Sequence, residues 1–197
     1  MLNQSILFQQ PSNPPPTLPL MNEPPSMTMP TSPPPAAIVE VQNNLGRFTF
    51  KRKAAITFPH GVVGFATARE FGLASLDDLA PGSNLQLLQC LNEPKLSFIV
   101  LPRGPENELI TKSDALDACN LLGFDPSVSL FFFIITLRKD QGDADMQMSL
   151  NVRAPVIADS TQRIGRQHVL SNPNYPVRMP LVIDSSGTTA ENSASPS

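Results

Sequence analysis

The sequence is short of the residues that most catalytic centres and metal sites require. It has two histidines, two cysteines, one tyrosine and no tryptophan in 197 residues. His60 and His168 belong to no HExxH or similar ligand spacing, so no metal site is predicted. Cys90 and Cys119 lie in apolar stretches. This placement favours two reduced core thiols in a cytoplasmic protein over a disulfide or a redox pair.

Motifs for nucleophilic or phosphate chemistry are also missing. Residues 61–64 (GVVG) include two glycines but lack the lysine and the following Ser or Thr of a phosphate loop, so a turn is expected there. No G-x-S-x-G sequence occurs. A hydrolase that pairs Cys90 with His60 or His168 is the enzymatic alternative, and it requires those side chains to meet in the fold. The sequence therefore favours a protein that is not an enzyme and that has no cofactor.

Positive charge and long apolar runs are scarce as well. Lys and Arg number 14 against 17 Asp and Glu, for a net charge of −3. Domains that bind nucleic-acid phosphates usually concentrate many more cations. The longest apolar run, residues 128–137, has half of the roughly 20 residues that a membrane helix needs. The first residues, MLNQS, lack the positive region of a secretion signal. We expect a soluble cytoplasmic protein that contacts no membrane.

Proline, by contrast, is abundant and unevenly placed. Of 22 prolines, eleven lie between Pro11 and Pro35. Each proline fixes φ and removes an amide donor, so neither a helix nor a central strand can run through this stretch. Residues 1–37 are therefore predicted to be a disordered proline-rich leader, and the small polar residues 182–197 a disordered tail. Residues 38–181 are long enough to fold as one domain.

Alternation of apolar and polar residues predicts a series of short strands in the foldable part. These strands cover residues 46–51, 55–58, 85–91, 96–101, 128–137, 147–152 and 156–158, and a further one ends at Val169-Leu170. Residues 92–95 are expected to form a hairpin turn, and the prolines of residues 102–105 to end the strand before them. Strand 128–137 is rich in Phe and Ile and is expected to be covered on both faces.

One helix is predicted between the strands. Ser113 can cap it, Asp114 suits its first turn, and Gly123 supplies the stop. Leu116, Cys119 and Leu122 are expected to form its buried face. Several short strands, one or two short helices and no βαβ alternation predict a mainly β fold. This pattern favours a single antiparallel β-barrel-like domain.

Arginines and the single tyrosine gather in the last third of the foldable part. Arg153 follows a predicted strand, Arg166 lies in a predicted turn, and Tyr175 and Arg178 share one short segment. Solvated surface is one interpretation of these four residues. The other is a protein-binding face, because arginine and tyrosine combine large contact area with directed hydrogen-bond donors. They are our candidate partner-binding residues.

Five short motifs in register resemble the flagellar assembly factor FliW family of bacteria. They cover about residues 46–181, in the family's order and spacing. The motifs are Ile56-Thr57-Phe58-Pro59-x-Gly61-x-x-Gly64-Phe65, Leu88-Gln89-Cys90-Leu91 before Phe98, Asn151-Val152-Arg153-Ala154-Pro155-Val156, Arg163-x-Gly165-x-Gln167, and Asn174-Tyr175-Pro176-Val177-Arg178 before Pro180-Leu181.

The resemblance implies a β-barrel-like fold and a role in binding proteins. Members of the family bind newly made flagellin in the cytoplasm, and they antagonise the RNA-binding translational repressor CsrA by binding it. The resemblance therefore implies flagellin and CsrA as partners, relief of flagellin synthesis from repression as function, and no direct contact with nucleic acid. We expect a monomer.

A partner that binds RNA should be basic, and this predicts a role for the acidic residues of this chain. Glu106, Glu108, Asp140, Asp143 and Asp145 are predicted to steer such a partner towards its site. The competing hypothesis is a small β-barrel that binds nucleic acid directly through its C-terminal arginines. That hypothesis predicts aromatic residues interleaved with the positive charge, and Tyr175 stands alone there.

Overall fold

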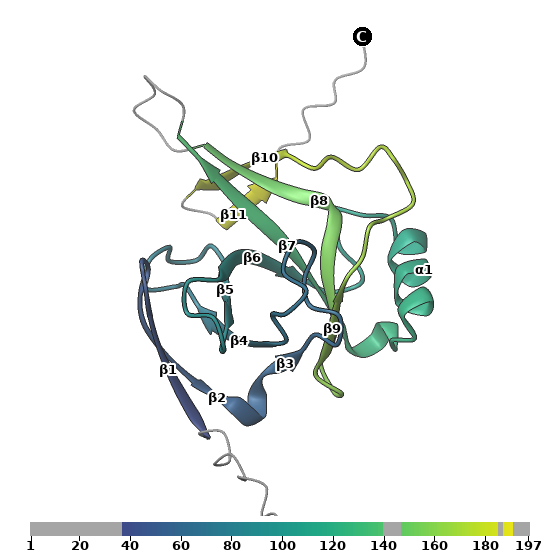
Figure 1. Ribbon diagram of the computed structural model, residues 1–197. Helices are drawn as coiled ribbons and strands as arrows, with labels where there is room; N and C mark the ends of the chain where they lie inside the picture. The colour runs from purple at the N-terminus through teal and green to yellow at the C-terminus, as the bar shows by residue number, and fades with distance from the viewer. Residues whose placement is uncertain (1–36, 140–146, 185–186, 191–197) are drawn as a thin grey trace, which may run out of the picture. The chain divides into compact units, whose positions relative to one another are not determined.

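The computed structural model describes residues 37–139, 147–184 and 187–190 (Figure 1). The predicted leader, apart from Ala37, lies outside the described residues. The strands are β1 (Ile38–Asn43), β2 (Gly46–Lys51), β3 (Ile56–Thr57), β4 (Glu70–Ser75), β5 (Gln86–Cys90), β6 (Ser97–Arg103), β7 (Ser129–Arg138), β8 (Gln147–Asp159), β9 (Ile164–Gln167), β10 (Met179–Asp184) and β11 (Gly187–Ala190). The helices are η1 (Arg52–Ala54), α1 (Lys112–Leu122) and η2 (Pro126–Val128).

Strands β3 to β9 close into a barrel. Each neighbour pairs with the next in the order β8-β7-β6-β5-β4-β3-β9, and β9 pairs back with β8. All of these pairs are antiparallel except β3 and β9, which meet in parallel at Thr57 and Ile164. The predicted β-barrel-like fold is confirmed. Its closure depends on one short parallel pairing that no local sequence pattern indicates.

Side chains alternate between the interior of the barrel and its outer face. On β7, Phe132 and Ile134 belong to one apolar cluster, and Phe131 and Phe133 belong to another. The first cluster takes residues from β3 to β8, whereas the second includes helix α1, so the first fills the barrel. We call it the lumen cluster. Its buried members are Ile56, Phe58, Val62, Ala68, Phe71, Leu88, Cys90, Val100, Phe132, Val156 and Ala158.

Helix α1 covers part of the outer face, but with different residues from those expected. Ala115, Ala118 and Cys119 are buried, whereas Leu116 is 37% exposed. The expected face was wrong at Leu116 because small side chains let the helix approach a sheet surface already filled by large Phe side chains. Gly123 ends the helix as predicted, in the left-handed conformation with φ 71°.

The helix also begins at a different cap from the one predicted. Thr111, and not Ser113, is the N-cap residue, and its hydroxyl oxygen accepts a hydrogen bond from the amide of Asp114 at 3.1 Å. Both residue types can cap a helix, so local sequence could not separate them. The amide of Thr111 donates to the hydroxyl of Tyr175 at 2.9 Å, a contact between distant parts of the chain.

The two strands predicted around Pro155 are one continuous strand, β8. It pairs with β7 up to Asn151 opposite Ile134, and again from Val156 opposite Phe132. Residues 152–155 therefore form a bulge of four residues opposite Phe133. Pro155 is tolerated here because the bulged backbone donates no hydrogen bond to β7. Instead, its carbonyl accepts from the amide of His168 at 3.0 Å.

Strand β6 runs through Pro102, where a break was predicted. Pro102 and Arg103 pair only with β7, because the last pair between β5 and β6 is Gln86 with Val100. Pro102 therefore lies beyond the end of the pairing with β5, where β6 has no neighbour on that side in the described part of the chain and its missing amide costs no hydrogen bond. Strands β1 and β4 were not predicted. The expected domain boundary at Leu181 lies within β10, and β11 pairs with that strand.

The β1–β2 hairpin packs against the barrel through Phe50. Phe50 is buried with Val41 and Leu91 in a small cluster of their own. Gly72 of β4 makes room for the Phe50 ring, since a Cβ there would lie 2.3 Å from a ring carbon. Cys90 and Cys119 are both unpaired and buried, in different clusters. None of the helices in the described ranges has the length and apolar character needed to cross a membrane.

Candidate functional site

A tight loop after β3 projects Phe65 from one end of the barrel. Gly61 has φ +70°, and a Cβ there would lie 2.3 Å from the carbonyl oxygen of Phe65, so only glycine fits. The amide of Phe65 donates to the carbonyl of Val62 at 2.7 Å, and the carbonyl of Phe65 accepts from Ala68 at 3.1 Å. Val62 and Ala68 are buried, and Phe65 between them remains 43% exposed. The loop thus holds a large aromatic ring partly in solvent.

A second loop, the turn between β5 and β6, is shaped by one buried glutamine. The Gln89 side chain is fully buried, and its amide nitrogen donates to the carbonyls of Cys90, Glu93, Pro94 and Leu96 at 2.9–3.4 Å. Its carbonyl oxygen accepts from the side chain of Asn43 at 2.8 Å. Because a buried amide is costly unless it is bonded, this network fixes the shape of the turn.

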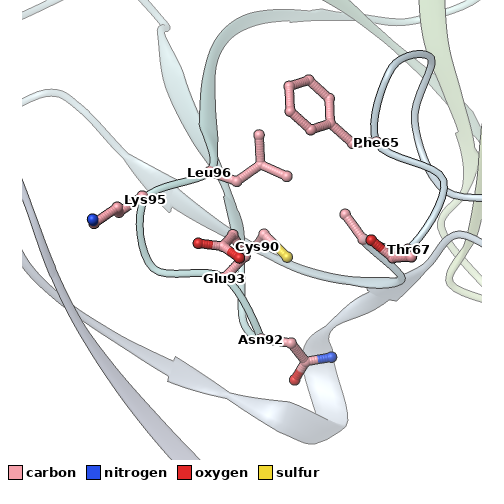
Figure 2. Close-up of a pocket in the computed structure, with 8 residues that line it drawn as sticks. Phe65, Thr67, Cys90, Asn92, Glu93, Lys95 and Leu96 are labelled. Atoms are coloured by element: carbon pink, nitrogen blue, oxygen red, sulfur yellow. The ribbon is translucent and has the colours of Figure 1, made fainter.

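These two loops enclose a cavity of about 440 Å³, which we call the barrel-mouth cavity. It is lined by Phe65, Thr67, Ala68, Cys90, Asn92, Glu93, Lys95 and Leu96. Figure 2 shows Phe65 on one loop and Leu96 on the other, with the sulfur of Cys90 directed towards the side of Thr67 and Lys95 pointing away from Phe65. Phe65 also meets Phe98 edge to face, with ring centroids 5.9 Å apart.

The chemistry of the barrel-mouth cavity suits binding. Its floor is apolar and its rim carries one acidic and one basic side chain, Glu93 and Lys95, both exposed. Its lining includes Cys90 but neither histidine. Partial burial lowers the pKa of His168 from its usual value. Among the residues that the structure describes, no three His, Cys, Asp or Glu side chains gather to hold a metal ion.

Of the residues predicted for partner binding, Arg153 is engaged within the protein. Its guanidinium donates to the backbone carbonyl of Asn172 at 2.6 Å, and its backbone carbonyl accepts from the amide of Leu170 at 2.9 Å. The amides of Val152 and Arg153 both donate to the carbonyl of Pro176, at 3.0 and 3.2 Å. Arg153 thereby holds segment 168–178 against the bulge of β8.

Tyr175 holds the other part of the same segment. Its hydroxyl donates to the carboxylate of Asp114 at 2.5 Å and accepts from the amide of Thr111. The Tyr175 hydroxyl, followed by the hydroxyl of Thr111, lowers the pKa of the Asp114 carboxyl from its usual value. Half-buried Tyr175 also packs on the second apolar cluster, the one that includes helix α1. The chain's only tyrosine therefore joins segment 168–178 to the start of α1.

Arg166 and Arg178 have different surroundings. Arg166 lies in β9 opposite Ile157, and its Nε is buried without a hydrogen-bond partner in the described part of the chain. Arg178 is exposed and lines a second cavity of about 380 Å³ with Arg138, Gln147 and Pro180 among others. The structure therefore distributes the four candidates along segment 168–178, the bulge and β9.

The acidic residues predicted to steer a partner are only partly described. Asp140, Asp143 and Asp145 lie outside the described residues. Glu108 is exposed, and Glu106 pairs with Lys112 at 2.5 Å with both side chains at least 70% exposed. This exposed pair lowers the pKa of Glu106 through the hydrogen bond and charge of Lys112. Exposed pairs of this kind contribute little to stability.

Several residues of the motifs have structural roles that sequence reasoning did not assign. Gly165 faces the lumen, where a Cβ would lie 2.7 Å from the Phe58 ring. Gln167 bridges two loops, since its side chain accepts from the amide of Val63 at 3.0 Å and donates to the carbonyl of Ala154 at 3.1 Å. Buried Asp159 accepts from the amides of residues 161 and 162. The contacts of Gly165 and Gln167 were invisible to spacing alone because their partners are distant in sequence, and those of Asp159 because its partners are backbone amides.

Comparisons of the sequence with family models and with known proteins identify the same family. The family model described as FliW protein matches residues 40–181. A flagellar assembly factor FliW of Bdellovibrio bacteriovorus is 31% identical over 144 residues, which cover 71% of this chain and 76% of that protein. One from a Geobacillus species is 26% identical over 133 residues, covering 66% and 85%.

A solved structure gives the same picture for the fold. A crystal structure of the flagellar assembly factor FliW superposes with a TM-score of 0.53 at 21% identity, covering 73% of this chain and 95% of that one. The family match to residues 40–181 contains both loops of the barrel-mouth cavity and segment 168–178.

Proposed function

Because this chain belongs to the FliW family of flagellar assembly factors, we propose that it binds newly made flagellin and the translational repressor CsrA in the cytoplasm. By binding the repressor it antagonises it, and so relieves repression of flagellin synthesis. The match of the family to residues 40–181, which contain the entire closed barrel, is the observation that carries this proposal.

The surface chemistry of the barrel supports binding as the mode of action. The barrel-mouth cavity offers apolar side chains and a mixed-charge rim, and such cavities are usual recognition sites. The interior of the barrel is filled by the lumen cluster, so reactants would have to be held outside it. The protein therefore acts by holding other proteins on its surface.

Competition between two partners would make the protein a regulator. If flagellin and CsrA compete for it, accumulating flagellin displaces CsrA, and free CsrA represses further synthesis. Secretion of flagellin then frees the protein to bind CsrA again. Such coupling requires that each partner lowers the affinity of the protein for the other, by the same factor in both directions.

The acidic residues supply a way to attract the repressor. An RNA-binding repressor is basic, and Glu106, Glu108, Asp140, Asp143 and Asp145 would raise its association rate more than its affinity. Replacing the three aspartates with asparagine should slow association and flatten its dependence on salt, as measured by stopped-flow fluorescence. An association rate that stays the same at low salt would reject this role.

Arg153, Arg166, Tyr175 and Arg178 stay candidates for a partner-binding face. Arg178 is exposed and suits direct contact, whereas Arg153 and Tyr175 would act by holding segment 168–178 in place. Alanine at each position, tested by calorimetric titration with both partners, decides the matter. A residue whose replacement leaves both affinities within about 0.5 kcal/mol, well below the cost of a hot spot, does not belong to the face.

The proposal as a whole is tested with the purified full chain. Flagellin monomer, CsrA and an RNA that CsrA recognises are each added, and complexes are measured by gel filtration and calorimetry. We expect complexes with flagellin and with CsrA, competition between them, and none with RNA alone. A chain that binds neither protein would refute the proposal, and one that binds RNA directly would favour the nucleic-acid alternative.

A further inference from the structure

We infer that the barrel-mouth cavity receives an apolar side chain from the assembly surface of an unassembled flagellin subunit. This inference rests on the proposed function and adds to it the surface that is used. The cavity was not predicted from the sequence, because its two walls come from separate segments, residues 61–68 and 91–96. None of the residues predicted for partner binding lines it.

Both walls of the cavity are built before any partner arrives. Gly61 forces the loop that presents Phe65, because any Cβ there would overlap the Phe65 carbonyl. Gln89 fixes the turn that presents Leu96, through four carbonyls and Asn43. A preformed site loses little conformational entropy when it is occupied, which raises affinity.

The apolar surface at this mouth is unfavourable in water. Phe65 is 43% exposed although its neighbours Val62 and Ala68 are buried, and half-buried Leu96 lines the same cavity from the other loop. Burying such surface is worth about 25 cal/mol per Å². An aromatic ring placed at the rim of an apolar cavity is a typical anchor in protein recognition. The cavity therefore fits one apolar side chain that docks between Phe65 and Leu96.

The charges at the rim indicate which partner fits. Glu93 and Lys95 are both exposed, and neither forms a side-chain ion pair within the described residues, so both can contact a partner. Their opposite charges cancel, so the rim would not attract a strongly basic RNA-binding repressor. A filament subunit before assembly exposes the apolar surface that later meets its neighbour, with charges of both signs around it. That chemistry complements the rim and the floor of the cavity.

The first test compares variants of the two walls. Phe65→Ala and Leu96→Ala each remove one side of the cavity, and Val63→Ala is the matched control in the same loop, 69% exposed and outside the lining. Calorimetric titration of the full chain with flagellin monomer should show affinity about tenfold weaker for each wall variant. The control should stay within about twofold of the wild type, and thermal melts should show that all variants fold.

The second test uses a cysteine introduced at the cavity as a reporter. The native thiols of Cys90 and Cys119 are both fully buried, so they should react slowly in the folded chain. Thr67→Cys places an exposed thiol in the lining, and Val63→Cys places one in the same loop outside the lining. Alkylation by iodoacetamide is followed by mass spectrometry for each variant, with and without flagellin. Bound flagellin should slow modification at position 67 severalfold and leave modification at position 63 within about twofold.

The outcomes separate the inference from the function on which it rests. If the wild type binds neither flagellin nor CsrA, the proposed function fails and the inference fails with it. If flagellin binds but both wall variants bind as tightly and the thiol of Thr67→Cys stays unprotected, only the inference is overturned. If the wall variants lose CsrA and keep flagellin, the cavity belongs to the repressor and the assignment made here is wrong.

Discussion

Two regions of the molecule, segment 168–178 and the barrel-mouth cavity, use aromatic and charged residues in opposite ways. Tyr175 of segment 168–178, and Arg153, which bonds to that segment, both direct their polar groups to partners within the protein. The Tyr175 hydroxyl bonds to Asp114 and to the amide of Thr111 at the start of α1, and Arg153 donates to the backbone of Asn172. At the mouth, Phe65 is partly exposed beside Glu93 and Lys95, and buried Gln89 makes the internal hydrogen bonds.

The comparison shows why residue type alone is a weak guide to an interface. Arginine and tyrosine favour interfaces because they combine area with directed donors, and the same property suits them to hold a loop on its own protein. Exposed surface next to a preformed cavity is a stronger indication. The barrel mouth combines exposed apolar surface with a preformed cavity. In segment 168–178, Arg178 is exposed and lines a cavity, whereas Arg153 and Tyr175 are held by internal hydrogen bonds.

The largest effect is expected from Gln89→Leu, which removes the residue that shapes the mouth. Buried and part-buried carbonyls of the turn and the side chain of Asn43 lose their partner, so the free energy of unfolding should fall by about 3 kcal/mol. Chemical denaturation measures this loss. Gln86→Leu in the same strand, where the side chain is partly exposed, is the control and should cost far less. Equal losses at the two positions would show that the network does not fix the turn.

Gly165→Ala tests the packing of the lumen on which both regions rest. The new Cβ would lie 2.7 Å from the Phe58 ring, which is fully buried and cannot move freely. Overpacking of this kind should lower the free energy of unfolding by about 2 kcal/mol. Gly104→Ala is the control, since nothing lies within 4 Å of a Cβ there. A variant as stable as the control would contradict the packing described for the lumen.

Arg153→Ala should have a smaller effect, confined to segment 168–178. It removes the bond to the Asn172 carbonyl and leaves the barrel strands paired, so a loss of about 1 kcal/mol is expected. Hydrogen exchange should become faster in segment 168–178 and stay the same at residues 61–68. Arg69→Ala, at an exposed arginine, serves as the control. Faster exchange at the mouth as well would show that the two regions are not independent.

Tyr175→Phe should have the smallest effect, and one that depends on pH. The hydroxyl of Tyr175 lowers the pKa of Asp114 in the folded protein, so this contribution to stability is present above the unfolded pKa, roughly 3.9, and is lost as pH falls through the folded value. The difference in melting temperature between wild type and variant should therefore be largest near neutral pH and shrink below about pH 4. A difference that is constant from pH 3 to pH 7 would contradict this role.

Local patterns in the sequence predicted much of the sheet and little of its closure. Strand β2 was predicted at its observed bounds, because GRFTFK alternates clearly. Strand β4 was missed because Gly72 and two polar ends interrupt its pattern, although Gly72 is there to receive Phe50. The break expected at Pro155 was wrong because the bulge of β8 makes the missing amide harmless.

The candidate site could be predicted only in part, for a related reason. The motifs that build its walls, around Gly61 and around Gln89, were both recognised in the sequence. Neither motif reveals that the two loops face each other, since that depends on the closure of the barrel through β3, β9 and β8. Exposure of Phe65 also has no local signal, because apolar residues of the same loop are buried at Val62 and Ala68 and exposed at Val63.

Hydrogen exchange of the full chain with and without flagellin tests the central claim most directly. The claim is that flagellin docks at the mouth of the barrel. Exchange should slow most in residues 61–68 and 91–96 when flagellin is added, with a smaller change in segment 168–178. Protection confined to segment 168–178, with unchanged exchange at the mouth, would contradict the account.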